Sequence, residues 1–405
     1  MKVFLVFFFL KKTPDSMSRR LFFLSTGTKS EICTFLCGFV AVGANRFMES
    51  QLSSESTLKL AALGLLGAIA LASVMGMLGA KNSMPVEGKT ILLTGGSDGM
   101  GRSVAIKLAA KGANVIIVAR NVQKLEETIE AMKSAAKSPK TQKFHHISAD
   151  VGKPGYATAL LEAATAWNGG QPPDIVWTVA GIAHPTLFAD TSDAVRIARQ
   201  AMDVNYWGTA ELAHAVLRAW YDPSSPAPGP GAEPRHLVFT STAAVMASIA
   251  GYGLYAPSKA ALSCLADALS QEVLLYPDHP VKIHVVLPGT ITSAAFEKEQ
   301  QIKHPVTKVL EKDDPVQTPD EVADASIRGL ERGNYLITVN WLGEALRWST
   351  IGSSWRNNWV VDILGAWLAQ LIWIFVLWDM RSALVSHAKK HGRPANQVKE
   401  SSVTG

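Results

Sequence analysis

Short runs of apolar, largely β-branched residues alternate with longer stretches of helical periodicity between Gly88 and Gly333. Six of these runs predict strands that are buried on both faces, because they lack the polar alternation of a half-exposed strand. They read TILLTG, NVIIVAR, FHHISADV, DIVWTVAG, HLVFTST and KIHVVLPG. Strands that alternate with helices form a parallel sheet covered by helices. The pattern therefore predicts an α/β domain with a doubly wound parallel sheet over residues 86–333.

An apolar stretch precedes this domain. Residues 60–80 carry no charged side chain, and about twenty apolar or small residues are enough for a helix to cross the hydrocarbon core of a bilayer. We therefore predict a transmembrane helix over residues 58–80. A buried core helix is the alternative, but the stretch lacks the polar stripe that such a helix usually has. Residues 1–57 form a poorly defined extension.

A second apolar stretch follows the domain at residues 363–378, where Gln370 is the one interruption. Its tryptophans resemble the aromatic belt of a membrane interface. The stretch is short for a full crossing, so a crossing, a re-entrant hairpin and a helix lying on the membrane all remain open. We predict a membrane-associated segment over residues 334–380 and a basic cytosolic tail over residues 381–405.

The composition narrows the range of partners. The chain has 405 residues, of which 48% are hydrophobic and 18% charged, and its formal net charge is +5. No run of Lys or Arg is long enough to follow a phosphate backbone, so the sequence argues against nucleic-acid binding and fits an anionic membrane surface better. The three cysteines form neither a disulfide framework nor a paired metal-binding motif, which indicates a reducing compartment and no metal site.

A glycine-rich turn joins the first predicted strand to the next helix in TILLTGGSDGMGRSVAIKLAAKG. Gly95, Gly99 and Gly101 have the spacing that lets a backbone approach a pyrophosphate at a helix N-terminus. A plain tight turn is the alternative, but the position between strand and helix is the one that dinucleotide binding requires. The sheet is therefore expected to be of the Rossmann type.

The charge after the second strand indicates which dinucleotide binds. Arg120 stands where an acidic residue would hold an unphosphorylated ribose, and a cation there favours the 2′-phosphate of NADPH. Lys124 lies one helical turn further on and can reinforce this preference. Ordinary solvated surface charges are the alternative for both residues. Asp150, which ends the third strand, is a candidate contact to the adenine.

Tyr255 and Lys259 are four residues apart in YAPSKAALSCLADALSQEV, so a helix here would place both side chains on one face. A phenol has a reference pKa near ~10, and a neighbouring ammonium stabilises its phenolate. A shift of about three units, equivalent to ~4 kcal/mol, would let Tyr255 exchange protons near neutrality. Such pairs are common on helix faces, but with the glycine turn upstream this one predicts an acid–base site.

The order of the motifs resembles the short-chain dehydrogenase/reductase family: the glycine turn, VAG, MDVNYWG, a hydroxyl-bearing strand end, YAPSK and LPG. The resemblance covers about Gly88 to Gly333. It implies that Tyr255 donates a proton to a carbonyl, that Lys259 lowers the pKa of Tyr255 and holds the ribose, and that Asn205 supports a proton relay through water.

The same resemblance implies cofactor contacts in two loops. In LPGTITS, Pro288, Ile291 and Ser293 match the loop that binds the nicotinamide end and covers the phosphates. In the glycine turn, the matching residues are Gly95, Ser97, Asp98 and Gly99.

Members of this family usually have a serine that orients the substrate carbonyl. Counting back from Tyr255 by the common spacing leads to Thr242, which keeps the hydroxyl and adds a methyl group. Ser241 is the neighbouring candidate. Because successive strand residues face opposite sides, only one of the two can point at the substrate. We favour Thr242 and leave the choice open at this point.

Within the family, the chain is most similar to membrane-anchored enzymes of sphingolipid synthesis. The similarity lies in TGGSDGMG, in VAG, in PGTITSAAFEKEQ followed by LEKDDPVQTPDEVA, and in the hydrophobic ends. It implies NADPH-driven reduction of a long-chain keto-lipid, 3-ketosphinganine, to sphinganine, at the endoplasmic reticulum membrane with the catalytic domain facing the cytosol. Family habit also implies a homodimer. A membrane ketoreductase for 3-ketoacyl-CoA, steroids or retinal is one alternative, and a non-catalytic nucleotide-binding scaffold is another.

Overall fold

The computed structural model describes residues 81–223, 233–350 and 352–392, all within the unit Ala80–Gly405. The extension expected over residues 1–57 and the transmembrane helix expected over residues 58–80 lie outside the described residues. So do residues 393–405 of the expected basic tail. The Rossmann-type domain and the apolar segment after it are described.

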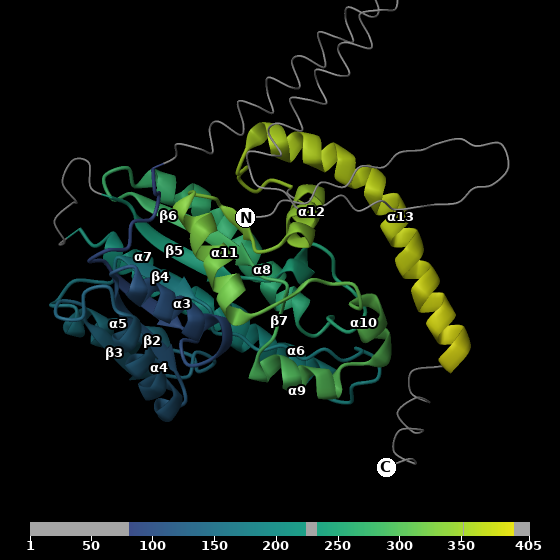
Figure 1. The fold of residues 1–405 in the computed structure, drawn as a ribbon, viewed down its shortest axis with the longest axis horizontal. Helices are drawn as coiled ribbons and strands as arrows, with labels where there is room; N and C mark the ends of the chain where they lie inside the picture. The colour runs from purple at the N-terminus through teal and green to yellow at the C-terminus, as the bar shows by residue number, and fades with distance from the viewer. Residues whose placement is uncertain (1–80, 224–232, 351, 393–405) are drawn as a thin grey trace, which may run out of the picture. The chain divides into compact units, whose positions relative to one another are not determined.

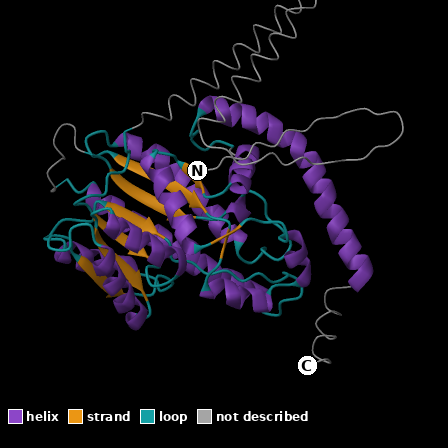
Figure 2. Cartoon of the chain, in the orientation of Figure 1, coloured by secondary structure: helices purple, strands orange, loops and turns teal. Residues whose placement is uncertain are grey.

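A seven-stranded parallel sheet forms the centre of the domain, in the order β3-β2-β1-β4-β5-β6-β9 (Figures 1 and 2). Its strands are β1 (Thr90–Thr94), β2 (Asn114–Ala119), β3 (Phe144–Ser148), β4 (Ile175–Thr178), β5 (Arg235–Thr240), β6 (Val281–Leu287) and β9 (Leu336–Thr338). The six strands expected from the apolar runs are all present. The order reverses beside β1, so a crevice for a ligand is expected at the carboxyl ends of β1 and β4.

Two apolar cores lie on opposite faces of this sheet. Ile91 and Leu93 of β1 belong to one core and Leu92 to the other, as the alternation of side chains along a strand requires. The first core includes residues of α3 (Gly99–Ala110), α4 (Val122–Ala135) and α11 (Pro319–Glu331). The second includes residues of α5 (Tyr156–Trp167), α7 (Gly208–Trp220) and α8 (Ala256–Glu272). Burial on both faces explains why most strands read as continuous apolar runs. Strand β3 at the edge of the sheet corrects the expectation, because its residues are half-buried or exposed.

Helix α11 shows how local sequence sets an element boundary. The hydroxyl of Thr318 accepts from the backbone N–H of Glu321 at 3.3 Å, and the Glu321 carboxylate accepts from the N–H of Thr318 at 2.8 Å. This reciprocal capping satisfies two N–H groups that a helix N-terminus leaves without partners, and Pro319 occupies a position where a missing N–H costs nothing.

The sheet extends beyond the boundary expected at residue 333, which is a correction. Strand β9 pairs with β6 in register Val285 with Leu336 and Leu287 with Thr338, so residues 336–338 belong to the Rossmann-type domain and not to a membrane segment. A strand of three residues is too short to produce a recognisable pattern of its own. Its pairing depends on the exposed edge of β6.

Helix α12 (Trp341–Thr350) follows β9 and is tied to the start of α13 (Trp359–His391). The buried guanidinium of Arg347 donates to the carboxylate of Asp362 at 2.6 Å and also pairs with Glu344. The side-chain amide of Asn357 bridges to the backbone of β9, with its oxygen accepting from Tyr335 N–H at 2.9 Å. The segment before α13 is therefore held against the domain by buried polar contacts.

Helix α13 exposes large apolar side chains around its first two thirds; Trp367 is 77% exposed and Trp378 is 68% exposed. A helix that is apolar all round normally has an apolar surrounding. Within the described residues, no single helix has the length and apolar composition to cross a bilayer. The two halves of α13, Trp359–Gln370 and Ile372–His391, meet those criteria only as a pair bent by 44°.

The remaining elements lie beyond the carboxyl ends of the strands or connect the main helices. They are α6 (Ala194–Ala201), a π-helix (Met202–Trp207), two 3₁₀ turns (Ala243–Val245 and Val273–Leu275), β7 (Thr290–Ile291), α9 (Ala294–Ile302), α10 (Pro305–Leu310) and β8 (Val316–Gln317). Strands β7 and β8 pair with each other in a small separate sheet.

Candidate active site

The glycine turn after β1 leaves no room for side chains. Gly95 has φ +74°, and a Cβ built on it would lie 2.7 Å from the backbone nitrogen of Ala180. A Cβ on Gly101 would lie 2.1 Å from the carbonyl oxygen of Gly95. The turn, the loop after β4 and the start of α3 are therefore packed backbone against backbone. Such a turn presents N–H groups at a helix N-terminus, so a nicotinamide dinucleotide fits here through its pyrophosphate.

The loop after β6 lies over this turn. Ser293 caps α9 by accepting from the N–H of Phe296 at 3.2 Å, and its Cβ lies 3.6 Å from the position of a Cβ on Gly99. Ile291 lies in β7, and the carbonyl of Pro288 accepts from Ala243 N–H at 2.8 Å. The structure thus brings the loop expected to cover the phosphates next to the glycine turn.

Of the two cations expected to select NADPH, one is already paired with a carboxylate of the protein. Asp98 caps α3 by accepting from Gly99 N–H at 2.7 Å, and its other carboxylate oxygen accepts from the ammonium of Lys124 at 2.5 Å. The pKa of Asp98 is lowered chiefly by this hydrogen bond. Arg120 is exposed directly after β2. Lys124 therefore has a protein partner already, and Arg120 is an exposed cation at this corner.

Two further expected cofactor contacts lie in loops at the same edge of the sheet. Ser97 is half-buried within the glycine turn. The carboxylate of Asp150 accepts from the N–H of Gly152 at 3.1 Å, so it stabilises its own loop after β3. The contact between Asp150 and the adenine stays a prediction.

Thr242 and Tyr255 meet at the end of β5. Tyr255 is the residue from which α8 begins, and the Thr242 hydroxyl lies close enough to its phenol to lower the pKa of Tyr255. The Thr242 hydroxyl also lies 3.4 Å from the carbonyl oxygen of Pro288 and accepts from Ala244 N–H at 3.3 Å. A threonine hydroxyl therefore stands beside the phenol at the position where the family usually has serine.

Ser241 does not share this site, which corrects its inclusion among the catalytic candidates. Its hydroxyl donates to the carbonyl of Lys259 at 3.0 Å and accepts from the hydroxyl of Ser263 at 2.9 Å. Both partners belong to α8. Because Ser241 and Thr242 follow each other in an extended segment, they point to opposite sides, and Ser241 faces the body of the helix.

Lys259 lies one turn into α8, and its side chain is buried. Its ammonium donates to the carbonyl of Thr240 at 2.8 Å, and burial lowers its pKa to about 8. A Cβ on Gly181 would lie 3.1 Å from this ammonium, so the loop after β4 passes close to it. The Lys259 ammonium is thus held between the end of β5 and the loop after β4, and its pairing with Tyr255 stays a prediction.

The pKa of Tyr255 is not lowered as the sequence predicted. Burial raises the pKa of Tyr255 well above its ordinary value of 10.0, the hydrogen bond from Thr242 acts in the opposite direction, and Glu299 raises it further. Desolvation of the phenolate outweighs the other effects. The phenol is therefore protonated at neutral pH, which suits an acid that gives up a proton when negative charge develops on a bound oxygen.

Asn205 occupies the π-helix and is fully buried. Its amide oxygen accepts from Ile182 N–H at 2.8 Å, and its amide nitrogen donates to the carbonyl of Ile182 and to the hydroxyl of Ser258, both at 2.9 Å. The side chain therefore joins the loop after β4 to the first turn of α8. With these partners satisfied, the amide fixes the positions of its neighbours; its part in a water relay stays a prediction.

A second group of residues lies on the other side of Tyr255. The sequence patterns did not identify them. The ring of Tyr252 lies 5.9 Å from that of Tyr255, and its hydroxyl donates to the carboxylate of Glu311 at 2.5 Å. Lys303 is buried and pairs with the same carboxylate at 2.7 Å. Tyr252, three residues before Tyr255, was a possible signal, but no local pattern indicates that the ends of α9 and α10 pack against it.

A groove of about 830 Å³ between α5 and α7 contains none of these side chains. The candidate site lies instead at the carboxyl edge of the sheet, at the ends of β1, β4 and β5 and the start of α8.

Comparison with known proteins agrees with this geometry. Residues 89–303 match the family described as short chain dehydrogenase. The chain is 49% identical over 358 residues to 3-ketodihydrosphingosine reductase gsl-3 of Neurospora crassa, covering 87% of this chain and 98% of that protein. It is 44% identical over 330 residues to 3-ketodihydrosphingosine reductase ksrA of Aspergillus fumigatus, covering 78% and 89% of the two chains.

Among solved structures, the fold is similar to that of a short chain dehydrogenase from Shigella flexneri complexed with NADP. The TM-score is 0.51 at 20% identity, and the match covers 64% of this chain and 98% of that one. This likeness concerns the parallel sheet and its helices.

Proposed function

This chain belongs to the short-chain dehydrogenase family, and from that premise we propose that it reduces 3-ketodihydrosphingosine (3-ketosphinganine) to dihydrosphingosine (sphinganine) with NADPH. Two fungal relatives that carry this activity in their names align over most of the chain. The observation that carries the proposal is the convergence of Thr242, Tyr255 and Lys259 beside the glycine turn.

The chain's own residues supply the binding and the proton. A reduced nicotinamide, when bound, supplies the hydride. The hydroxyls of Thr242 and Tyr255 converge on one point and can both donate to the ketone oxygen, which polarises the carbonyl. As the carbonyl carbon gains the hydride, Tyr255 transfers its proton to the oxygen and the alcohol forms. The cation of Lys259 then lies one helical turn from the phenolate that is left.

NADPH is the proposed dinucleotide on the evidence of charge at the end of β2. Arg120 is exposed at that corner, and a guanidinium binds a phosphate through paired hydrogen bonds. Lys124 is paired with Asp98 at the start of α3. Its positive charge attracts a phosphate only to the extent that the charge of Asp98 does not neutralise it. Arg120 is therefore the principal candidate for recognition of the 2′-phosphate.

A membrane surface is the proposed location, specifically the endoplasmic reticulum with the domain in the cytosol. A substrate with a long alkyl chain is concentrated in lipid, and α13 exposes an apolar surface with tryptophans. Flotation of the purified protein with liposomes tests this, and failure to float would contradict it. The homodimer implied by the family is a further proposal, which the sedimentation of detergent-free protein tests.

The decisive experiment is product analysis. Purified protein is incubated with NADPH or NADH and with 3-ketodihydrosphingosine, a 3-ketoacyl-CoA, a ketosteroid or retinal, and the products are identified by mass spectrometry. We expect sphinganine as the preferred product, a higher rate with NADPH, and a loss of at least about 100-fold in the Tyr255→Phe variant. A preference for the CoA thioester would contradict the substrate, and turnover that survives Tyr255→Phe would contradict the mechanism. No turnover of any ketone would favour a nucleotide-binding scaffold.

A further inference from the structure

Tyr252 supports both the start of α8 and the ring of Tyr255. Its carbonyl oxygen accepts from the N–H of Tyr255 at 3.0 Å and from the N–H of Ala256 at 2.8 Å. The rings of Tyr252 and Tyr255 lie 5.9 Å apart, centre to centre, at an angle of 56°, which is within the range of a favourable aromatic contact. The backbone and the ring of Tyr252 therefore both bear on the position of the phenol that donates the proton.

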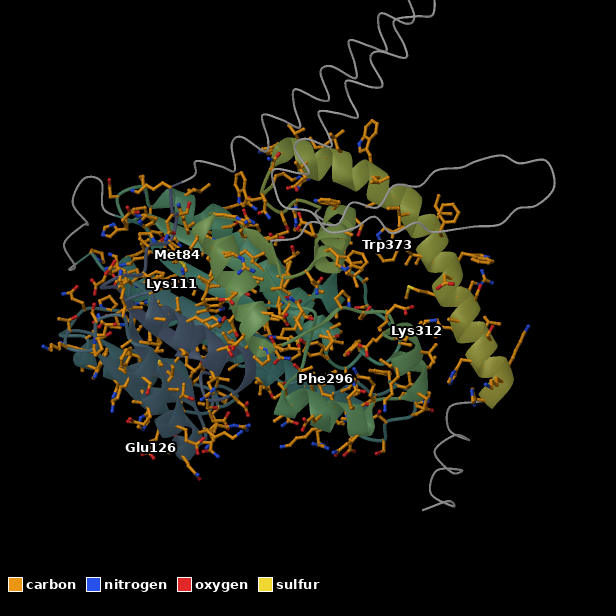
Figure 3. All side chains as sticks on the ribbon, viewed as in Figure 1. Met84, Lys111, Glu126, Phe296, Lys312 and Trp373 are labelled. Carbon is orange, nitrogen blue, oxygen red and sulfur yellow. The ribbon has the colours of Figure 1, made fainter. Side chains whose placement is uncertain are left out.

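The hydroxyl of Tyr252 is held by a buried ion pair. It donates to the carboxylate of Glu311 at 2.5 Å, and the same carboxylate pairs with the ammonium of Lys303 at 2.7 Å. The side chain of Lys303 is 1% exposed and that of Glu311 is 12% exposed. The ammonium also lies 5.7 Å from the ring centre of Tyr252 and 5.5 Å from that of Phe296, which Figure 3 labels on α9. A buried pair is costly to break, so it fixes the hydroxyl of Tyr252.

This ion pair ties the ends of two helices to the catalytic loop. Lys303 directly follows α9, and Glu311 directly follows α10. Helix α10 contacts the same loop at a second point, where the hydroxyl of Thr307 donates to the carbonyl of Ala250 at 2.8 Å. The loop that leads into α8 is thus held at its backbone by one contact and at the hydroxyl of Tyr252 by the other. The second contact is the one that reaches the aromatic pair.

The geometry points to Tyr252 as a positioning residue for the transfer of the Tyr255 proton, a role that rests on the proposed function. The pair of Lys303 and Glu311 acts through Tyr252 by fixing its hydroxyl. Proton transfer requires the donor within hydrogen-bond reach of the acceptor, and a displacement of about 1 Å can cost about 100-fold in rate. Release of the Tyr252 hydroxyl would widen the range of positions open to the phenol of Tyr255.

The test removes one hydroxyl from each of two tyrosines with matched contacts. Tyr252→Phe keeps the ring and loses the hydrogen bond to Glu311. Tyr335→Phe is the control, because the hydroxyl of Tyr335 donates to the carboxylate of Asp267 on α8 at 2.6 Å, and Tyr335 precedes β9 at the amino edge of the sheet. Each carboxylate keeps another partner after the change. Steady-state rates with NADPH and 3-ketodihydrosphingosine are measured in H2O and in D2O, together with NADPH affinity and the thermal midpoint.

We expect Tyr252→Phe to lower kcat by about tenfold while KM and the dissociation constant of NADPH change by less than about twofold, since Thr307 still holds α10 on the loop. The solvent deuterium isotope effect on kcat should rise because proton transfer becomes slower relative to the other steps. Tyr335→Phe should lower the thermal midpoint by a similar amount and leave kcat and the isotope effect as in the parent protein.

A second comparison tests whether the ion pair acts through Tyr252. Glu311→Gln should lower kcat by a few-fold in the parent protein and should add no further loss to Tyr252→Phe, because the hydroxyl that transmits its effect is already absent. Losses that multiply in the double variant would show that the ion pair acts by another route.

The positioning role would be overturned by a kcat of Tyr252→Phe within about twofold of the parent, by an unchanged isotope effect, or by an equal loss of kcat in Tyr335→Phe. If the parent protein reduces a different ketone, the proposed substrate is wrong, and the same comparison with that ketone still decides the role of Tyr252. A parent protein that reduces no ketone would refute the proposed function and this role with it.

Discussion

At the scale of single residues, substitutions at Thr242 test whether its hydroxyl orients the substrate carbonyl. The Thr242 hydroxyl lies beside the phenol of Tyr255 and lowers its pKa, whereas the hydroxyl of Ser241 is engaged by α8. We expect Thr242→Val to lower kcat by about 100-fold because a donor to the developing oxyanion is lost, and Thr242→Ser to stay within about fivefold of the parent. Steady-state kinetics measure both.

Ser241→Ala is the matched control for that comparison. It removes two buried hydrogen bonds to α8, so we expect a loss of about 1–2 kcal/mol in the free energy of unfolding with kcat nearly unchanged. If Ser241→Ala lowered kcat as much as Thr242→Val, the assignment of the orienting hydroxyl would be wrong.

The pH dependence of the reaction follows from Lys259. Burial lowers its pKa from 10.5 to about 8, so the ammonium is lost as the pH rises through about 8, well below the range in which an exposed lysine titrates. Tyr255 remains protonated there because its pKa is raised. We expect kcat/KM to be level between pH 6.5 and 7.5 and to fall above about pH 8. A profile that stays level to pH 10 would show that the charge on Lys259 is not needed.

At the scale of elements, α10 is docked on the loop that leads into α8. The Thr307 hydroxyl donates to the carbonyl of Ala250 at 2.8 Å. Gly251 has φ +104°, and a Cβ there would lie 2.2 Å from the Thr307 hydroxyl oxygen. The close approach of α10 to the catalytic loop therefore depends on the absence of a side chain at position 251.

Gly251→Ala should displace α10 from this loop. We expect KM for the keto-lipid to rise by about tenfold and stability to fall by about 1–3 kcal/mol because of the strained φ, with little change in the dissociation constant of NADPH. Gly253→Ala is the control, since a Cβ there would meet only Phe188 at 3.9 Å. An NADPH affinity that fell as much as the keto-lipid affinity would mean that the whole site, not the α10 contact, had been disturbed.

At the scale of the whole molecule, a buried histidine pair connects three strands. Nδ1 of His236 on β5 lies 3.0 Å from Nε2 of His284 on β6, and Nδ1 of His284 donates to the carbonyl of Asn334 just before β9 at 2.7 Å. Burial lowers the pKa of His236 to about 2 and that of His284 to about 4. The pair is therefore neutral in the folded protein.

This pair makes stability depend on pH. The unfolded histidines titrate near the ordinary value of about 6.5, so between about pH 6.5 and the lowered folded values the unfolded state binds more protons and stability falls as the pH falls. At pH 5 each histidine should reduce the free energy of unfolding by about 2 kcal/mol relative to pH 7.5. Denaturant titrations at the two pH values measure this, and replacing both residues with Gln should flatten the dependence. An equal pH slope in that double variant would assign the effect to other groups.

Elements with local sequence patterns could be predicted. Six strands, of which all but the edge strand β3 are buried, and the glycine turn with its following helix were predictable, because burial, backbone approach and helical spacing each constrain neighbouring residues. Only the tertiary structure decided between Ser241 and Thr242, since a helix from elsewhere in the chain takes one hydroxyl.

The features that the sequence did not predict depend on contacts between segments that are distant along the chain. The pairing of β9 with β6 moved the end of the domain beyond residue 333, and Asp98 engaged the lysine that was expected to bind a phosphate. Burial raised the pKa of Tyr255, which the spacing to Lys259 had predicted to be lowered, because desolvation depends on everything packed around the group.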